Sequence, residues 1–260
     1  MNGSFVLDSV SCGYGGKKVL DGFSAEIRGG ALTALIGPNG SGKSTLLKLL
    51  GGIAGYVGSA ALDGRELRSM SRAEFGRAVG FVPQQTKITT PFTVYEVIAM
   101  GRLPYCGLFS KLSGEDDAAV LRAAERAGVS HLLFRRASEL SGGEQQRVCV
   151  AVALAQEPEV FLLDEPTSAL DPNQSVRIFS IMRALASEGR TVVVAAHDIN
   201  GAIPFSDRFI ALRGGGLAAQ GEASELDENI LAPLYGIEFK KYVSEEGGRA
   251  WHPSAKSFSL

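Results

Sequence analysis

The sequence predicts an α/β fold in which strands and helices alternate around one core, with a mostly helical insertion at about residues 88–156. Two observations support this prediction. Apolar runs with the length of buried strands recur at residues 31–36, 79–83, 160–163 and 191–195. Within the insertion, apolar residues recur at helical spacing instead. With 45% hydrophobic and 21% charged residues, the composition is that of an ordinary globular protein.

Antiparallel strands are expected before and after these core strands in the sequence. Residues 5–11 and 23–28 have strand patterns and flank a glycine-rich turn at residues 13–16, and a further short strand is expected near residues 60–62. These three strands predict an antiparallel β subdomain. Residues 208–218 resemble a hairpin.

Capping patterns mark several helix starts. Ser71 and Thr93 are each followed three residues later by Glu, which is the capping-box pattern. Residues 115–127 form an amphipathic run that Gly128 closes. Residues 171–187 begin with an Asp-Pro pair, an N-cap followed by proline at the first helical position.

Residues 37–45 read G-P-N-G-S-G-K-S-T and satisfy the phosphate-loop pattern G-x-x-x-x-G-K-[ST]. Glycines let backbone N–H groups turn toward phosphate oxygens, and the start of the following helix adds partial positive charge. We expect Lys43 to bridge the β- and γ-phosphates of ATP and the Ser44 hydroxyl to bind Mg²⁺. A simple helix-capping turn is the alternative, which the flanking strand and helix argue against. The ATP-binding residues predicted here are Gly37, Asn39, Gly40, Ser41, Gly42, Lys43, Ser44 and Thr45.

Two carboxylates, Asp164 and Glu165, follow the apolar run at residues 160–163. A buried strand delivers them to the carboxyl edge of the sheet, where ligands of such sheets bind. We expect Asp164 to hold Mg²⁺, directly or through water, and Glu165 to act as the general base that polarises the attacking water. Taken alone, these two carboxylates could lie in a solvated turn. The phosphate loop earlier in the chain favours a catalytic role for them instead.

Residues 140–147 read L-S-G-G-E-Q-Q-R and contain a capping box that opens a helix to about residue 156. The two glycines let the first N–H groups of this helix approach an anion closely. The octet matches the signature of the ATP-binding-cassette (ABC) ATPases, and the chain resembles that family over about residues 5–235. The resemblance implies a phosphate-loop NTPase (RecA-like) core with antiparallel β and helical subdomains, and ATP hydrolysis as the activity.

Other positions agree with the resemblance. Tyr14 sits where the family places an aromatic residue that stacks on adenine, and His197 follows a strand as the switch histidine. Gln84 matches the Q-loop glutamine, which the resemblance places among the catalytic residues and the Mg²⁺ ligands. Gln85 competes for this role, and the motif register favours Gln84. Residues 168–171 match the D-loop.

The resemblance also implies that ATP is bound between two copies of the chain related head to tail. In this family the signature of one copy covers the nucleotide on the phosphate loop of the other copy, and hydrolysis releases the pair. The residues expected to contribute to the ATP site in this way are Ser141, Gly142, Gly143, Glu144 and Asp171.

Within the family, residues 94–105, 197–200 and 232–236 resemble importers of ferric siderophores, haem or cobalamin. This resemblance implies two integral-membrane permease subunits that contact a groove around residues 84–102 and, indirectly, an extracytoplasmic substrate-binding protein. We therefore expect a peripheral location at the cytoplasmic face of the cell membrane. The ATPase does not touch the transported substrate, so its identity cannot be predicted.

Composition disfavours other classes. The formal net charge is −2 with no run of Lys or Arg, so nucleic-acid binding by a basic surface is unsupported. No apolar stretch approaches the ~20 residues that span a bilayer, and the start lacks the features of a signal peptide. The three cysteines, Cys12, Cys106 and Cys149, are scattered, which predicts reduced thiols rather than disulfides or a zinc site.

Two alternative functions stay open. Soluble ABC ATPases of DNA repair, chromosome structure or translation usually carry coiled-coil insertions or two tandem cassettes, and this chain has neither. A nucleotide-gated binding module without turnover is disfavoured by Glu165 and His197. Pro204 should kink or end the helix after His197. Residues 236–260, the end of the expected single domain 1–260, have no predicted role.

Overall fold

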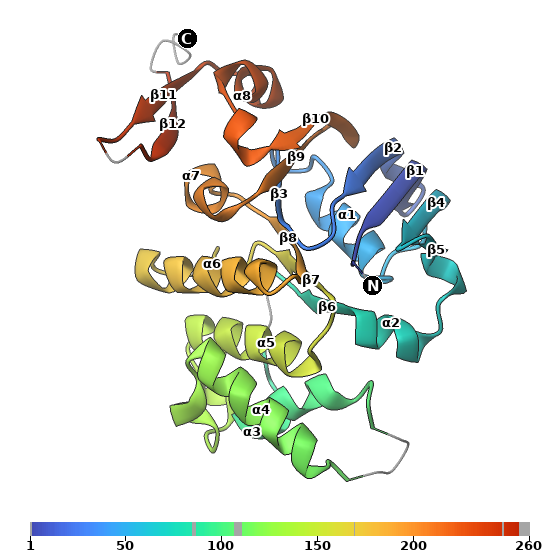
Figure 1. The fold of residues 1–260 in the computed structure, drawn as a ribbon, viewed down its shortest axis with the longest axis vertical. Coiled ribbons are helices and arrows are strands. Elements are labelled where there is room, and N and C mark those ends of the chain that lie inside the picture. Colours follow the sequence, from blue (N-terminus) through green and yellow to red (C-terminus); the bar gives the residue numbers. More distant parts are fainter. Residues whose placement is uncertain (1, 85–86, 107–110, 169, 246, 255–260) are drawn as a thin grey trace.

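A six-stranded sheet runs through the centre of the computed structural model, which describes residues 2–84, 87–106, 111–168, 170–245 and 247–254 (Figure 1). The strand order is β10-β9-β3-β8-β7-β6, and five neighbouring strands are parallel, with β10 antiparallel at one edge. The bounds are β3 Leu32–Ile36, β6 Val79–Val82, β7 Val160–Asp164, β8 Thr191–Ala195, β9 Arg208–Arg213 and β10 Gly216–Glu222. The predicted strands and the α/β fold class are confirmed.

Both faces of this sheet are buried, which explains why its strands are continuous apolar runs. In β3, Leu32, Ala34 and Ile36 face one core, whereas Leu35 between them faces the other. The strand β8 alternates in the same way. Side chains of successive residues point to opposite faces of a strand, so a single apolar run supplies two cores.

A second sheet, in the order β2-β1-β4-β5, is antiparallel throughout. Its strands are β1 Phe5–Tyr14, β2 Lys17–Ile27, β4 Val57–Leu62 and β5 Arg65–Glu66. The helix α1 (Lys43–Leu50) shares one core with this sheet and with one face of the central sheet, and its four leucines are fully buried there. The start of α1 is therefore held rigidly, which matters because the phosphate loop leads into it.

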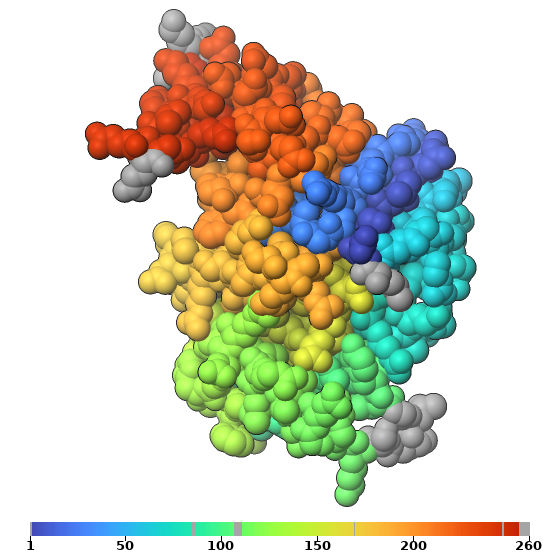
Figure 2. Space-filling model, viewed as in Figure 1, coloured from blue at the N-terminus to red at the C-terminus, as the bar shows by residue number. Residues whose placement is uncertain are grey.

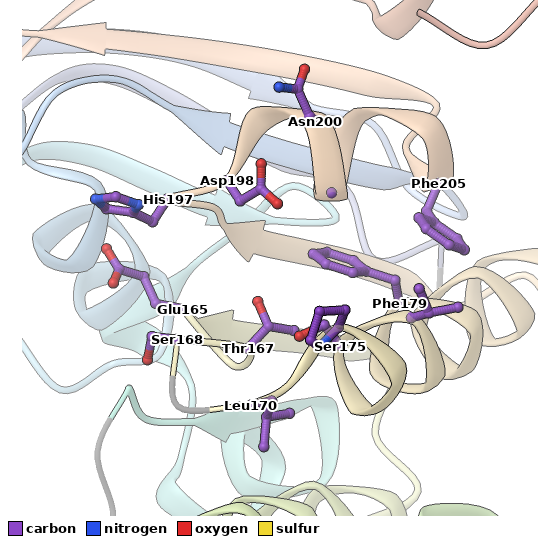
Figure 3. Close-up of a pocket in the computed structure, with 13 residues that line it drawn as sticks. Glu165, Thr167, Ser168, Leu170, Ser175, Phe179, His197, Asp198, Asn200 and Phe205 are labelled. Atoms are coloured by element: carbon purple, nitrogen blue, oxygen red, sulfur yellow. The ribbon is translucent and has the colours of Figure 1, made fainter. Parts of the chain in front are cut away.

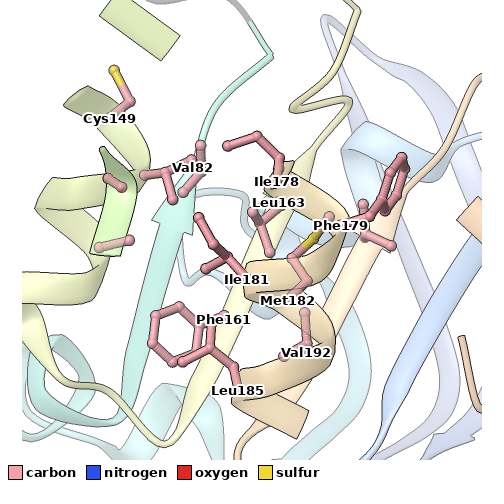
Figure 4. Packing of buried hydrophobic residues seen from close by; sticks show 14 of the residues in the cluster. Val82, Cys149, Phe161, Leu163, Ile178, Phe179, Ile181, Met182, Leu185 and Val192 are labelled. Carbon is pink, nitrogen blue, oxygen red and sulfur yellow. The ribbon is translucent and has the colours of Figure 1, made fainter. Parts of the chain in front are cut away.

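The other face of the central sheet is covered by helices. These are α3 Val94–Ala99, α4 Gly114–Ala127, α5 Gly142–Gln156 and α6 Pro172–Ser187. The helix α2 (Arg72–Ala78) instead packs against the core shared with the antiparallel sheet, through Phe75 and Ala78. Figure 4 shows the apolar side of α6 packed on the sheet, with Ile178, Ile181, Met182 and Leu185 beside Phe161 and Leu163. The predicted capping boxes of α2, α3 and α5 are present.

Helices α3, α4 and α5 form one end of the molecule (Figures 1 and 2, green to yellow). Their apolar sides, together with Cys149 on α5, belong to the core that also covers the sheet. The limits of a separate helical subdomain at residues 88–156 stay a prediction. Both His131 and His252 are exposed.

The opposite end of the molecule is formed by the C-terminal segment (Figures 1 and 2, red). The helix α8 (Glu228–Tyr235) is followed by a hairpin of β11 (Phe239–Val243) and β12 (Arg249–Pro253). The helix after His197, α7 (Ile199–Ala202), ends two residues before Pro204, and a 3₁₀ turn follows; this prediction is confirmed. Among the described helices, none is long and apolar enough to cross a lipid bilayer.

Candidate nucleotide-binding site

Four parallel strands deliver the predicted catalytic residues to one edge of the central sheet. The strand β3 leads into Gly37, β6 ends just before Gln84, β7 ends in Asp164, and β8 ends just before His197. The strands pair in register, since Asp164 lies opposite Ala195 of β8. Carboxyl ends of parallel strands meet at one edge, so residues far apart in sequence converge here.

Glycine is required at three positions of the phosphate loop. The backbone φ angles are 145° at Gly37, 76° at Gly40 and 109° at Gly42, all in the region that favours glycine. A Cβ atom on Gly42 would lie 2.7 Å from the Leu20 side chain. The loop thus closes tightly around the start of α1.

The Lys43 ammonium lies over this loop. Its Nζ donates to the carbonyl oxygens of Gly37 at 2.7 Å and Pro38 at 3.3 Å, and the residue is 5% exposed. Burial lowers the pKa of Lys43, while the nearby Glu165 and Asp164 carboxylates act in the opposite sense. A buried cation beside two carboxylates is placed to meet an incoming polyphosphate.

Ser44 and Asp164 meet across the site. The Ser44 hydroxyl donates to Asp164 Oδ1 at 2.8 Å, and Asp164 is 3% exposed. Burial raises the pKa of Asp164, and the Ser44 hydrogen bond opposes this shift. Both side chains offer oxygen, the donor that Mg²⁺ prefers, so they fit the predicted metal site. Within the described residues no cluster of three or more His, Cys, Asp or Glu could hold a metal, and Mg²⁺ is usually bound by one or two protein ligands with phosphate and water.

Glu165 is held in a strained conformation by its neighbours. Its φ angle is 45°, which is uncommon for a residue other than glycine. Its N–H donates to the Ala195 carbonyl at 3.1 Å, and Gln84 Nε2 donates to its Oε2 at 2.7 Å. Strain of this kind clusters at active sites. The alternative Q-loop residue, Gln85, lies outside the described residues.

His197 faces the same hollow as Glu165. The hollow has a volume of about 640 Å³ and runs between α6 and α7, and Figure 3 shows the two side chains at the same end of it. His197 is exposed. Ser168 and Leu170 of the predicted D-loop also line the hollow, while Ala169 between them lies outside the described residues.

The signature residues lie elsewhere, at the start of α5. The Ser141 N–H donates to Glu144 Oε2 at 2.8 Å, and the capping box is closed by the Ser141 hydroxyl. These bonds lower the pKa of Glu144. Ser141 and Gly142 are exposed. No hydrogen bond among the described residues joins this helix start to the phosphate loop.

The D-loop and the signature helix are close to one another. A Cβ atom on Gly143 would lie 2.8 Å from Gln174 Oε1 and 3.2 Å from Leu170 Cδ2. Asp171, predicted to help join two copies, caps α6 by accepting from the Gln174 N–H at 2.9 Å. The sequence did not indicate the role of Gln174.

The remaining predicted ATP-binding residues frame the loop. Asn39 is exposed with Gly40 at the outer part of the loop, whereas Ser41 and Thr45 are buried. Tyr14 is 52% exposed at the end of β1. Its stacking on adenine stays a prediction.

Sequence reasoning missed two residues that contact the site from the C-terminal side. The Gly37 N–H donates to the Tyr235 hydroxyl at 3.2 Å. Asn200, three residues after His197, exchanges two hydrogen bonds with the backbone of Trp251. Both residues lie in segments that resemble the importer group, residues 197–200 and 232–236. That resemblance did not indicate these contacts.

A phosphate loop before a helix, an acidic pair at the end of a neighbouring parallel strand, and a capped glycine pair on a separate helix together define an ATP-binding cassette. The chain belongs to the ABC transporter family, which matches residues 20–168. It is an ATP-binding subunit of that family, whose members hydrolyse ATP to drive transport.

Several relatives are ATP-binding proteins of importers. The ferric enterobactin transport ATP-binding protein FepC of Escherichia coli is 36% identical over 88% of this chain and 86% of its own length. The hemin import ATP-binding protein HmuV of Streptomyces coelicolor is 40% identical over 85% of this chain and 79% of its own. The cobalamin import ATP-binding protein BtuD of Halobacterium salinarum is 42% identical over 77% of this chain and 50% of its own.

Solved structures agree with the family. A metal-chelate type ABC transporter in an inward-facing conformation superposes with a TM-score of 0.83 and 27% identity over 98% of this chain and 99% of that chain. A dimeric ATP-binding cassette in a post-hydrolysis state, bound to ADP and phosphate, has a TM-score of 0.74 and 30% identity over 84% of this chain and 98% of that chain.

Proposed function

We propose that this chain hydrolyses ATP to drive import of a substrate of the iron-siderophore, haem or cobalamin type. The observation that carries the proposal is the convergence of Lys43, the Ser44–Asp164 pair and the Gln84–Glu165 pair at one sheet edge. The names of the relatives supply the substrate class.

In this proposal, ATP lies on the phosphate loop. Backbone N–H groups of residues 37–45 and the start of α1 receive the phosphates, and Lys43 exchanges the carbonyls of its own loop for β- and γ-phosphate oxygens. Tyr14 stacks on the adenine ring. Ser44 and Asp164, with Gln84 at the same edge, would hold Mg²⁺, which neutralises phosphate charge when bound.

Hydrolysis is assigned to the residues beside the γ-phosphate. Water attacks the γ-phosphorus, the bond to the β–γ bridging oxygen breaks, and Glu165 accepts the proton that the water loses. Gln84 holds the Glu165 carboxylate at 2.7 Å, and His197 contacts the γ-phosphate from the other side. The products are ADP and phosphate.

The signature acts from a second copy. Ser141 and the N–H groups of Gly142 and Gly143, with Glu144 closing the cap, contact the γ-phosphate bound by the partner copy. Leu170 of the D-loop lies beside Gly143 of the signature, and Asp171 helps to join the halves. A closed pair that prefers ATP over ADP converts hydrolysis into motion.

We further propose that the pair binds two permease subunits around residues 84–102, at the cytoplasmic face of the membrane, and that an extracytoplasmic protein selects the substrate. The test is purification of the tagged chain from membranes, with identification of what accompanies it. A polytopic permease and stimulated phosphate release support the proposal. Recovery without membrane protein but with repair or ribosomal proteins supports a non-transport ATPase, and ATP binding without phosphate release supports a binding module.

A further inference from the structure

The C-terminal segment contacts the phosphate loop and the helix α7 that follows His197. It comprises α8 and the hairpin of β11 and β12, and Figure 1 shows it beyond β9 and above α7. Its first contact is with the phosphate loop and its second is with the helix that follows His197.

The first contact joins Tyr235 to Gly37. The Gly37 N–H is the first of the phosphate loop and is buried, and it donates to the Tyr235 hydroxyl at 3.2 Å. Burial raises the pKa of Tyr235, so the hydroxyl stays neutral at physiological pH. A buried N–H without a partner is costly, and Tyr235 therefore favours the loop conformation seen here.

The position of Tyr235 is itself fixed. The ring lies 5.6 Å from that of Phe239 on β11, measured between centroids. Arg213, at the end of β9, donates to the Pro233 carbonyl of α8. The hydroxyl thus reaches the loop from a helix that is tied to the sheet and to the hairpin.

The second contact joins Asn200 to Trp251. Asn200 Nδ2 donates to the Trp251 carbonyl at 3.0 Å, and the Trp251 N–H donates to Asn200 Oδ1 at 2.9 Å. Trp251 is 3% exposed. Asn200 also lines the hollow, and in Figure 3 its side chain points away from Glu165. The hairpin therefore holds α7, and with it the backbone that carries His197.

We propose that the C-terminal segment positions the ATP site at two points, with Tyr235 as a positioning residue for the phosphate loop and the Asn200–Trp251 pair as a positioning contact for His197. Neither residue touches the reacting atoms. This inference rests on the proposed ATPase function. The two contacts serve different steps, so they predict different kinetic effects.

The first test is Tyr235→Phe in the full chain. The variant keeps the ring beside Phe239 and removes the hydroxyl that partners Gly37. ATP must then reorder the loop, so affinity falls roughly five- to twentyfold, within the range expected for unpairing a buried donor, and kcat at saturating ATP changes less than about twofold. The matched control is Tyr242→Phe, on the exposed part of the hairpin, which leaves both values unchanged.

The second test is Asn200→Ala, which removes both hydrogen bonds to the Trp251 backbone. Loss of these bonds lowers kcat roughly three- to tenfold with KM for ATP unchanged, because His197 is misplaced while the phosphate loop is intact. Asn200→Asp loses the donor to the Trp251 carbonyl and places a carboxylate oxygen against it, so its kcat falls at least as far. Asn229→Ala, an exposed amide on α8, is the control and has no effect.

A uniform fall in both parameters for both variants, or normal kinetics for both, overturns the inference and leaves the proposed function intact provided that the natural chain hydrolyses ATP. Absence of hydrolysis in the natural chain contradicts the proposed function instead. Hydrogen exchange at the Gly37 amide gives a test that needs no variant. Slow exchange without nucleotide supports the Tyr235 contact, and exchange at the rate of an open loop contradicts it.

Discussion

The sheet edge and the start of α5 both present groups that suit phosphate, but their surroundings differ. At the edge, Lys43 and Asp164 are at least 95% buried and engaged with neighbours. At the start of α5, Ser141 and Gly142 are exposed. The Ser141 side chain accepts from the Glu144 N–H, and other N–H groups of the first turn have no partner within the helix and can receive a ligand.

This difference shows what each region lacks. The edge has a buried cation, the proposed metal ligands and the proposed base, but the signature residues are not among the groups that hydrogen-bond there. The start of α5 has N–H groups and the positive end of a helix, but the described residues place no base or lysine beside it. In the proposed arrangement, two copies related by a two-fold axis would supply each region with what it lacks.

The largest expected effect is that of Glu165→Gln, which should slow ATP hydrolysis at the sheet edge without preventing the two copies from pairing. Glu165→Gln removes the base but keeps an oxygen for Gln84, so hydrolysis falls roughly 10²- to 10⁴-fold while ATP binding persists. The two copies then stay joined in ATP, which gel filtration detects. Glu115→Gln, an exposed carboxylate on α4, serves as control and retains activity. Hydrolysis at the normal rate by Glu165→Gln would remove Glu165 from its proposed role.

A second variant should weaken ATP binding at the sheet edge. Lys43→Ala removes a charge-assisted contact worth roughly 1.5–3 kcal/mol, so ATP affinity falls by about one to two orders of magnitude. Calorimetry measures this loss, with Lys240→Ala on the hairpin as control. Unchanged affinity in Lys43→Ala contradicts the proposed contact between Lys43 and the phosphates.

The smallest effect concerns stability and comes from Asp164. Burial raises its folded-state pKa, so the chain loses stability as pH rises from about 3.9, the ordinary value, through the folded-state value. Asp164→Asn cannot titrate and can still accept from Ser44. It should raise the unfolding temperature at pH 7, because the buried charge is removed, while losing hydrolysis.

The pH dependence checks this account of Asp164. The difference in unfolding temperature should vanish well below pH 3.9, where the natural carboxyl is protonated in both states. Asp8→Asn, an exposed carboxylate on β1, provides the comparison. A lower unfolding temperature for Asp164→Asn across the whole pH range would show that the buried charge is not the destabilising feature.

Local patterns were enough to predict much of this molecule. Capping boxes at Ser71, Thr93 and Ser141 act within four residues, and each helix begins where the pattern indicates. Apolar runs of strand length predicted the central sheet because burial on both faces demands them. The pairing of Ser44 with Asp164 was inferable, since parallel strands bring their carboxyl ends together.

Contacts without a local pattern escaped prediction. Tyr235 and Gly37 are 198 positions apart, and an apolar ring with one hydroxyl looks like any core tyrosine. The hairpin of β11 and β12 could not be predicted either, because β11 is largely exposed and shows no buried alternation. The hairpin is attached to α7 through the backbone N–H and carbonyl of Trp251. Every residue other than proline has these two groups, so a sequence does not show which of them will form such a contact.

The exposed Gly142 permits a direct test of the shared site. A Cβ atom at this position would meet no atom within 4 Å, and an acidic residue in the first turn stabilises a helix. Gly142→Asp should therefore fold normally, yet its carboxylate repels the phosphates held by the partner copy. Lys43→Ala instead damages the phosphate loop of its own copy.

The most direct measurement is ATP hydrolysis by a one-to-one mixture of Gly142→Asp and Lys43→Ala at an ATP concentration near the KM of the natural chain, where each variant alone should have little activity. A mixed pair has one site with an intact loop and an intact signature, so activity should return to as much as about a quarter of normal if copies pair at random. If each copy instead completed its own site, both members of the mixed pair would stay defective. Activity no higher than the sum of the separate variants would contradict the account.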